Sequence, residues 1–390
     1  MIIHTVSSGE GIWSIAAKYG IPVTKLIEDN DISDEHTAVG DELLILRPTK
    51  TKTVSGGDTL DSLSRRYGVR RSTLLANNPS LKGNERLRAG RIITIKQDAP
   101  VLGAATAMAT VTRSSTAAQL TRIMPYATYI RINAASLTAE GRLNMDYNPQ
   151  RLCEPCIHGK KVALLGVCDI GNGAFLESSE NIGALLDNLT EAAKSNGFKG
   201  ICLSARTAAA KQPERFSEFI LAVRKRFIGC DLILFTDVFE DTPTEASELS
   251  DGAVLILPSI PKNDMYAKLS DFSAYAESSK VLVSLSAYAD TPDKDSRISI
   301  TEAKELCRRS GSMISLDKDS LICNFDYTRY KRGVGEKLNI RFPSLKYTKA
   351  KLEMISELGF MGISIEAEAV PSYVLSMFNA LFARADYTLP

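Results

Sequence analysis

The sequence is poor in several residue types on which common kinds of active site depend. Its 390 residues include only three histidines, which argues against a Ser-His-Asp catalytic system. No run of about 18 apolar residues occurs, so we expect no membrane-spanning segment. Cys153 and Cys156 form one Cys-x-x-Cys pair without a second pair to complete a zinc site. We therefore predict a loop with incidental thiols there, and no metal or other cofactor.

The cysteines and the start of the chain indicate the compartment of synthesis. Seven cysteines, an odd number, are scattered through apolar stretches, which suits a reducing environment and thiols used as small core residues. The first residues, Met-Ile-Ile-His-Thr-Val-Ser, contain no basic region followed by an apolar core, so we expect no signal peptide. Together these features predict a protein made in the cytoplasm.

Charge is nearly balanced over the whole chain, at +1, but it is unevenly spread. Residues 1–49 carry a net charge of −5, residues 50–97 carry +8, and the remainder carries −2. A basic segment favours an anionic partner such as a cell-wall polymer or nucleic acid, although a solvated basic face is equally consistent. The basic segment lacks the interleaved aromatics typical of single-stranded nucleic-acid binding, so we expect no nucleic-acid partner.

The first 97 residues contain one pattern twice, about 48 residues apart. Residues 4–21 align with residues 52–69, as in His4-Thr-Val-Ser-Ser-Gly-Glu against Lys52-Thr-Val-Ser-Gly-Gly-Asp. In each copy a second helical segment follows, and the copy closes with a short strand after a glycine. The order strand, helix, helix, strand predicts two small α+β units, at residues 1–48 and 50–97.

This repeat resembles the LysM family over nearly the whole of both copies. The resemblance implies binding of N-acetylglucosamine-containing glycans, usually peptidoglycan or chitin, in a shallow groove between two loops. Open turns rich in glycine and asparagine suit that role, because they expose backbone donors and acceptors to acetamido groups. The residues implied are Gly9, Glu10, Gly11, Ile12, Asn30, Asp31 and Ile32 in the first copy, and Gly56, Gly57, Asp58, Thr59, Leu60, Asn77, Asn78, Pro79, Ser80 and Leu81 in the second.

The first copy departs from the family pattern at Glu10-Gly11, where Asp-Thr is usual. We expect weaker capping of the helix that follows, because glycine has no side chain to accept a backbone hydrogen bond. That puts the glycan affinity of the first copy in doubt. The alternative for any single position is that these glycine, aspartate and threonine residues only make turns and caps.

From residue 98 to residue 390, short apolar strands alternate with helical patterns, which predicts a (β/α)8 barrel of the TIM type. The fold class is therefore α/β, with an α+β insertion at about residues 298–342 between the seventh and eighth strands. We predict strands at Val101–Met108, Ala127–Ile132, Val162–Cys168, Gly200–Ala205, Leu232–Asp237, Ala253–Pro258, Val281–Ser286 and Met361–Glu366. We predict helices near Ala117–Met124, Asn181–Ser195, Pro213–Phe227, Thr244–Leu249, Asp264–Ser278 and Lys346–Leu358.

Two LysM-like units before such a barrel resemble the bacterial spore cortex-lytic glycosylases of glycoside hydrolase family 18. Residues 127–143 match that group's second strand and hairpin, and residues 342–364 match its last helix and strand. The family's catalytic carboxylates do not match. Its fourth-strand motif falls here on Lys199, Cys202, Ser204 and Arg206, its Tyr-Asp pair on Pro258-Ser259, and its aromatic platform on Glu366.

These departures predict a catalytically inactive barrel. Arginine stays protonated in proteins, so Arg206 cannot be the general acid, whose loss alone costs roughly 10² to 10⁴ in rate. The single tryptophan of the chain, Trp13, lies in the first LysM-like unit, which leaves the barrel without an indole on which sugars stack. The leading hypothesis is thus a non-catalytic protein that binds peptidoglycan or a similar glycan.

Other carboxylates offer an alternative. Asp169, Asp237, Glu240, Glu366 and Glu368 follow predicted strands on the side where barrels carry their active sites, and two of them could restore glycosidase activity. We favour ion pairs between these acids and Arg206 or Lys199, because buried unpaired cations are costly. The spore-enzyme resemblance implies location in the spore cortex or coat, with coat proteins as further partners. A purely structural role without glycan affinity is the third hypothesis.

Overall fold

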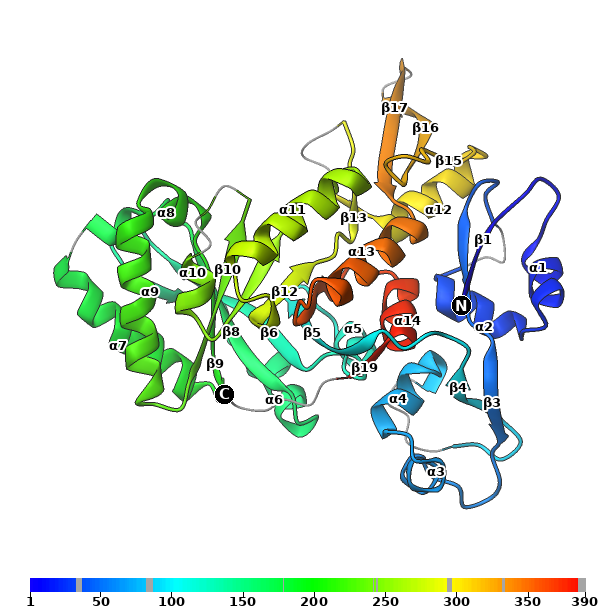
Figure 1. Ribbon diagram of the computed structural model, residues 1–390, viewed down its shortest axis with the longest axis horizontal. Helices are drawn as coiled ribbons and strands as arrows, with labels where there is room; N and C mark the ends of the chain where they lie inside the picture. The colour runs from blue at the N-terminus through cyan, green and yellow to red at the C-terminus, as the bar shows by residue number, and fades with distance from the viewer. Residues whose placement is uncertain are drawn as a thin grey trace.

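The computed structural model describes residues 1–32, 37–81, 87–177, 179–240, 242, 245–292, 297–331 and 334–384. Two small N-terminal units lie beside a larger barrel, and the insertion projects from the barrel near the first unit (Figure 1). No helix in the described part of the chain is long and apolar enough to cross a membrane.

Both N-terminal units have the predicted order of strand, helix, helix and strand. The first consists of β1 (Ile2–Thr5), α1 (Ile12–Tyr19), α2 (Val23–Asn30) and β2 (Glu42–Ile45). The second consists of β3 (Pro48–Thr53), α3 (Leu60–Tyr67), α4 (Arg71–Ala76) and β4 (Ile92–Gln97). In each unit the two strands pair antiparallel, and the helices cover one apolar core.

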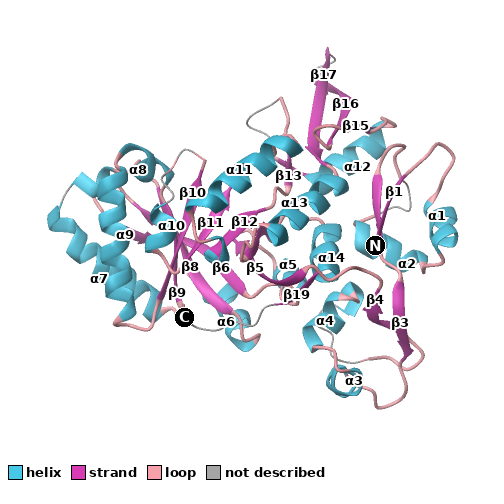
Figure 2. Ribbon diagram, viewed as in Figure 1, coloured by secondary structure: helices cyan, strands magenta, loops and turns pink. Residues whose placement is uncertain are grey.

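The remainder is the predicted closed parallel barrel. The sheet closes because β5 pairs in parallel with both the second and the last barrel strand. Figure 2 shows these strands surrounded by helices. All eight strands lie where the sequence predicted them: β5 (Gly103–Val111), β6 (Tyr129–Leu137), β8 (Val162–Asp169), β9 (Gly200–Ser204), β10 (Ile233–Phe239), β11 (Gly252–Ile256), β12 (Val281–Ser284) and β18 (Gly362–Glu366).

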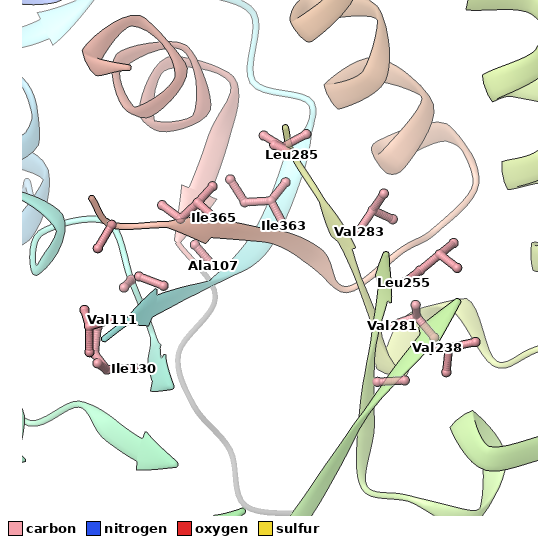
Figure 3. Close-up of a cluster of buried hydrophobic side chains, with 14 of the residues drawn as sticks. Ala107, Val111, Ile130, Val238, Leu255, Val281, Val283, Leu285, Ile363 and Ile365 are labelled. Carbon is pink, nitrogen blue, oxygen red and sulfur yellow. The ribbon is translucent and has the colours of Figure 1, made fainter. Parts of the chain in front are cut away.

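The side chains of each barrel strand point alternately inward and outward, and so form two apolar layers. Leu282 packs among the side chains that fill the barrel interior, with Met108, Cys202 and Phe235. Its neighbours on the strand belong to the layer between strands and outer helices. Figure 3 shows part of that outer layer. Successive side chains of a strand point to opposite faces, so a strand buried on both faces is apolar at nearly every position.

The outer helices include both predicted and unpredicted elements. The predicted helices are α5 (Ala117–Ile123), α7 (Ser179–Ser195), α9 (Pro213–Ile228), α10 (Glu245–Leu249), α11 (Lys262–Tyr275) and α13 (Leu345–Glu357). Three more were not predicted: α6 (Gln150–His158), α8 (Arg206–Lys211) and α14 (Ser372–Leu381), which leads into the short strand β19 (Phe382–Arg384). The loop predicted around Cys153 and Cys156 is wrong, because both lie on α6.

The insertion follows β12, as predicted. After β13 (Tyr288–Ala289) it contains β14 (Ile298–Ser299), α12 (Ile300–Ser310), β15 (Ser315–Leu316) and the long hairpin of β16 (Ile322–Lys331) and β17 (Val334–Pro343). Its small apolar core includes Ala38 of the first N-terminal unit. The insertion and that unit therefore share buried surface.

Helix α14 is the element on which both N-terminal units dock. The Ser376 hydroxyl donates a hydrogen bond of 2.9 Å to Asp29 of α2, and the Asn379 amide donates one of 2.8 Å to Asn77, next to α4. Asp29 and Asn77 are equivalent positions of the repeat. The two units thus contact successive turns of one helix through the same part of their own structure.

The first unit makes further contacts that the second lacks among the described residues. Lys304 of α12 forms an ion pair of 2.8 Å with Asp41, and Lys346 of α13 forms one of 2.8 Å with Glu42. A Cβ atom at Gly40, whose φ is +85°, would lie 1.9 Å from the Ile314 carbonyl oxygen. This close approach requires glycine and shows how tightly the first unit is held.

Candidate functional site

The first loop of each N-terminal unit is closed by one carboxylate. Glu10 accepts a backbone hydrogen bond of 2.9 Å from Ser7, and its equivalent Asp58 accepts one of 2.8 Å from Ser55. The Ser7 amide, followed by Lys18, lowers the pKa of Glu10 from 4.5 to about 2. Glutamate therefore replaces aspartate in the first copy without opening the loop.

Helix capping differs between the copies in the direction that the sequence predicted. The Thr59 hydroxyl accepts a hydrogen bond of 3.0 Å from the Ser62 amide and so caps α3. Gly11 has no side chain for the same role, and α1 has no side-chain cap. In the first copy only the second hydrogen bond of the capping box remains, which the Gly11 amide donates to the Ser14 hydroxyl at 3.0 Å.

The asparagines implied as glycan ligands have their side chains turned inward. Asn30 and Asn78, at equivalent positions, each bond to the preceding helix and to the last strand of their unit. Asn77 bonds to the Ile95 carbonyl and to Asn379. Four apolar residues of the implied grooves are buried in the cores of their units: Ile12, Ile32, Leu60 and Leu81.

What remains at the surface of the implied grooves is mostly backbone. Gly9, Gly11, Gly57 and Thr59 are exposed, and Glu10, Asp58, Asp31 and Pro79 are half-buried. Asp31 binds the Ser372 amide and hydroxyl at the N-terminus of α14. Contacts to a ligand at these loops would therefore come chiefly from peptide groups and glycine-lined surface, which suits acetamido groups.

The barrel has a cleft of about 840 Å³ at the carboxyl ends of its strands. This is the end at which TIM barrels carry their active sites. The predicted positions Ser204, Pro258, Ser259 and Glu366 line it. Further lining residues that the sequence analysis did not single out include Arg131, Asn133, Tyr288, Asp290 and Arg297.

A buried ion pair lies among the residues that line the cleft. Arg131 Nη1 lies 2.7 Å from Asp237 Oδ1, and its Nε donates to Asn133 Oδ1 at 2.8 Å. The Arg131 and Asp237 side chains are 7% and 5% exposed. Burial alone would lower the pKa of Arg131, but the Asp237 carboxylate outweighs it and raises that pKa. The charged residue in the otherwise apolar strand at residues 127–132 was a sequence signal for this pair.

Two further carboxylates of the cleft are held by neighbours. Glu366 Oε1 lies 3.0 Å from Arg297, whose guanidinium stacks 3.7 Å above the Tyr288 ring. Glu368 accepts hydrogen bonds from the hydroxyls of Ser115, Thr112 and Ser114. Partial burial opposes ionisation of Glu368, but these hydroxyls outweigh it and lower its pKa.

The four positions of the family motif are dispersed around β9. Lys199 is exposed just before the strand, Cys202 is buried inside the barrel, and Arg206 is exposed as the first residue of α8, 5.3 Å from the centre of the Phe239 ring. Three of the five acids that we expected beside Arg206 or Lys199 lie beside other cations. Asp237 pairs with Arg131, Glu366 with Arg297, and Glu240 with Lys268.

Two carboxyl groups in the described part of the chain have raised pKa values. Partial burial raises the pKa of Asp290, which lines the cleft, and Arg341 opposes that shift. Burial also raises the pKa of Asp169, against hydrogen bonds from the Gly171 and Gly173 amides. A carboxyl with a raised pKa in a cleft can hold a proton nearer to neutral pH. Asp290 is therefore the cleft carboxyl best suited to donate a proton.

Neither the cysteines nor the acidic residues form a metal site in the described part of the chain, where no three metal-binding side chains gather. Burial raises the pKa of Cys153 to about 11 and that of Cys156 to about 12. Both thiols are therefore protonated at neutral pH and are poor metal ligands or nucleophiles.

Comparison with known proteins supports two separate likenesses. A family model for the LysM domain matches residues 4–45 and 53–96, so the two N-terminal units are LysM domains. The crystal structure of the spore cortex-lytic enzyme SleL of Bacillus megaterium QM B1551 superposes with a TM-score of 0.75 at 20% identity, over 99% of each chain. The whole arrangement of two LysM domains and barrel is therefore that of SleL, and at this identity the likeness concerns the fold.

Curated relatives match smaller parts. The candidate sporulation-specific glycosylase YdhD of Bacillus subtilis is 24% identical over 237 residues, which are 58% of this chain and 55% of that protein. The N-acetylmuramoyl-L-alanine amidase sle1 of Staphylococcus epidermidis is 37% identical over 75 residues, 17% of this chain and 23% of the amidase. The chain thus spans about half the length of one relative and about a quarter of the other.

Proposed function

We propose that this protein binds an N-acetylglucosamine-containing glycan, with peptidoglycan as the leading candidate, through its LysM domains, and that its barrel does not cleave the glycan. Two LysM domains with surface-exposed backbone turns support the binding half. So do a relative named as an N-acetylmuramoyl-L-alanine amidase and a solved structure named as a spore cortex-lytic enzyme.

One observation carries the proposal of inactivity. The position of the family's general acid holds Arg206, and two of the cleft's other acids, Asp237 and Glu366, each have an arginine within 3.0 Å. A carboxylate paired with a guanidinium is stabilised in its ionised form and is a poor proton donor. A missing general acid costs roughly 10² to 10⁴ in rate.

The same relatives bear on location and partners. We propose that the protein lies in the spore cortex or coat of a spore-forming bacterium, and that coat proteins are its further partners. The names of SleL and YdhD, a spore cortex-lytic enzyme and a sporulation glycosylase candidate, support this location. Immunogold labelling of spores with an antibody to the full chain tests it, and label confined to vegetative cytoplasm contradicts it.

The binding and the inactivity are tested together on purified peptidoglycan. We expect the full chain to sediment with insoluble peptidoglycan and to be released by soluble chitooligosaccharide, without producing new reducing ends. Failure to sediment contradicts the binding proposal and favours a purely structural protein. Production of reducing ends contradicts the proposal of inactivity.

An active N-acetylglucosaminidase is the second candidate, and Asp290 favours it. Asp290 lines the cleft and has a raised pKa, so it could protonate a leaving oxygen. If turnover is seen, Asp290→Asn should reduce it by roughly 10² or more. Asp319→Asn, an exposed change in the insertion outside the cleft, is the matched control. Equal activity of the two variants would remove Asp290 from the mechanism.

A further inference from the structure

A second hollow lies between the first LysM domain and the barrel cleft. It has a volume of about 470 Å³, and its lining runs from Asp31 across α5 and α12 to Val370. Tyr288 and Glu368 line both this hollow and the barrel cleft. The two hollows therefore adjoin at Tyr288 and Glu368, and between them their linings extend from the second ligand loop of the first LysM domain to the carboxyl ends of the barrel strands.

The LysM end of this path is fixed to the barrel. Asp31, in the implied glycan loop, binds the Ser372 amide and hydroxyl and lies 3.9 Å from Arg122. The ion pairs of Asp41 with the insertion and of Glu42 with α13 hold the rest of the domain, and the first of them is buried. A tether this tight keeps the loop and the cleft in one arrangement, so a ligand that reaches both needs no domain movement.

We propose that the first LysM domain and the barrel cleft form one composite groove that binds the uncharged sugar backbone of a single polysaccharide chain along the path from Asp31 to Glu366. The composite groove presupposes the glycan-binding function proposed above. It adds the assignment of the hollow around Thr301, Gln119 and Glu302 as the middle of the binding path. It also gives the barrel a role in binding that needs no catalysis.

The chemistry of the middle section fits a sugar polymer. Gln119 is held in place by hydrogen bonds to Thr116 and to the Glu368 carbonyl, and Glu302 is held by Ser299. Amide and carboxylate groups keep lone pairs or N–H groups for a further partner, and side chains already ordered lose little entropy on binding. Hydroxyl-rich ligands match such a surface.

The charges of the groove exclude the common anionic polymers. Asp31, Glu302 and Glu368 bring three carboxylates to the hollow. Its cation, Arg122, donates to the backbone carbonyls of Ala367 and Val370 and lies beside Asp31. A nucleic acid or an acidic polymer would meet like charge there, whereas a neutral glycan would not.

The test uses the single tryptophan of the chain. Trp13 follows Ile12 of the first ligand loop and is 61% exposed, so its fluorescence reports occupation of the first LysM domain. Tetramers and octamers of β-1,4-linked N-acetylglucosamine are titrated into the full chain. We expect the octamer to bind roughly tenfold or more tightly than the tetramer, because its second half engages the barrel at high effective concentration.

Thr301→Phe places a bulky side chain in the middle hollow and keeps Trp13 as the only tryptophan. We expect it to remove the advantage of the octamer and to leave tetramer affinity within about twofold. Met313→Phe is the matched control, because Met313 is 65% exposed in the insertion and outside both hollows. It should behave like the unchanged protein.

The outcomes separate the two proposals. If the tetramer leaves Trp13 fluorescence unchanged and gives no heat in calorimetry, the glycan-binding function of the first domain is wrong. If the tetramer binds but the octamer gains nothing, or if the gain survives in Thr301→Phe, the composite groove is wrong and the LysM domain binds alone. If Thr301→Phe and Met313→Phe both lose the gain, the effect is not specific to the hollow and the composite groove is again wrong.

Discussion

The two LysM domains share one fold but use equivalent positions differently. The first copy, at −5, presents Asp29, Asp41 and Glu42 to Ser376 and to two lysines of the insertion and α13. The second copy, at +8, makes a neutral contact through Asn77 and has Arg91 where the first has Asp41. The acidic character of the first copy serves its attachment to the barrel.

That difference teaches which copy is available to other partners. Asp41 and Glu42 pair with lysines of the insertion and α13, so these carboxylates are not available to other partners. The first domain is therefore firmly attached to the barrel. The second copy carries a net charge of +8, and its Arg66 and Arg71 lie beside acids of the same domain, Asp58 and Asp61. The second domain is thus the better candidate for contact with an anionic part of a cell-wall polymer.

The largest expected effect is the loss of the first domain's anchor. Asp41→Ala leaves Lys304 buried without its carboxylate, and breaking a buried pair costs about 3–5 kcal/mol. The equivalent change in the second copy, Arg91→Ala, removes a contact to Ser80 and should cost about 1 kcal/mol or less. Denaturant unfolding of the full chain measures both. Equal losses would contradict the different attachment of the two domains.

A smaller difference is expected on α14. Ser376→Ala removes a hydrogen bond to the charged Asp29, worth about 1.5–3 kcal/mol. Asn379→Ala removes a bond to the neutral Asn77, worth about 0.5–1.5 kcal/mol. Hydrogen exchange at α2 and α4 would show which domain loosens in each variant. Loosening of both domains by either change would show that they dock cooperatively and not independently.

Helix capping provides a third comparison. Thr59→Ala should destabilise the second domain by about 1 kcal/mol, because it removes the cap of α3. Gly11→Thr should stabilise the first domain by a similar or smaller amount, because Gly11 has the extended backbone of a cap residue and open space for a Cβ atom. Thermal unfolding monitors both. A loss of stability in Gly11→Thr would show that the first loop requires glycine.

The smallest expected effect is on the stability of the folded state at acidic pH. The pKa of Glu10 is lowered from 4.5 to about 2, so its ionised form stabilises the folded state above pH 4.5, and this contribution is lost as pH falls towards 2. Glu10→Gln should therefore be less stable than the unchanged protein at pH 6, and the two should converge towards pH 2. Asp58→Asn is the counterpart in the second copy, where the pKa is also lowered. A constant difference across this range would contradict the role of Glu10.

Prediction of the fold from the sequence failed mainly at α14. Its residues Ser-Tyr-Val-Leu-Ser-Met-Phe-Asn-Ala-Leu are buried on nearly all sides, because the barrel covers one side and both LysM domains cover another. A helix buried all round lacks the one-sided apolar stripe by which amphipathic helices are recognised. The eight barrel strands were predictable because burial on both faces makes each an apolar run between turns.

Prediction of the sites failed where a side chain could either bind a ligand or form a contact within the protein. Asparagine is common in exposed turns, yet the Asn30 and Asn78 side chains are hydrogen-bonded to the last strand of their LysM domains. Ion pairs of the cleft acids with Arg206 or Lys199 were predicted, but the cations beside Asp237 and Glu366 are Arg131 and Arg297. Those arginines lie 106 and 69 residues from their partners, beyond the reach of any local pattern.

By itself, the sequence determined the repeat, the barrel and the absence of the family's carboxylates from β9, because each of these depends on local periodicity or on residue identity. The tertiary structure alone decided that the first LysM domain is pinned to the barrel and that Asp237 and Glu366 of the cleft are paired with arginines. It also decided that a second hollow lies between that domain and the cleft. Ion pairs and shared walls depend on distances between segments far apart in the chain, and those distances exist only once the barrel has closed.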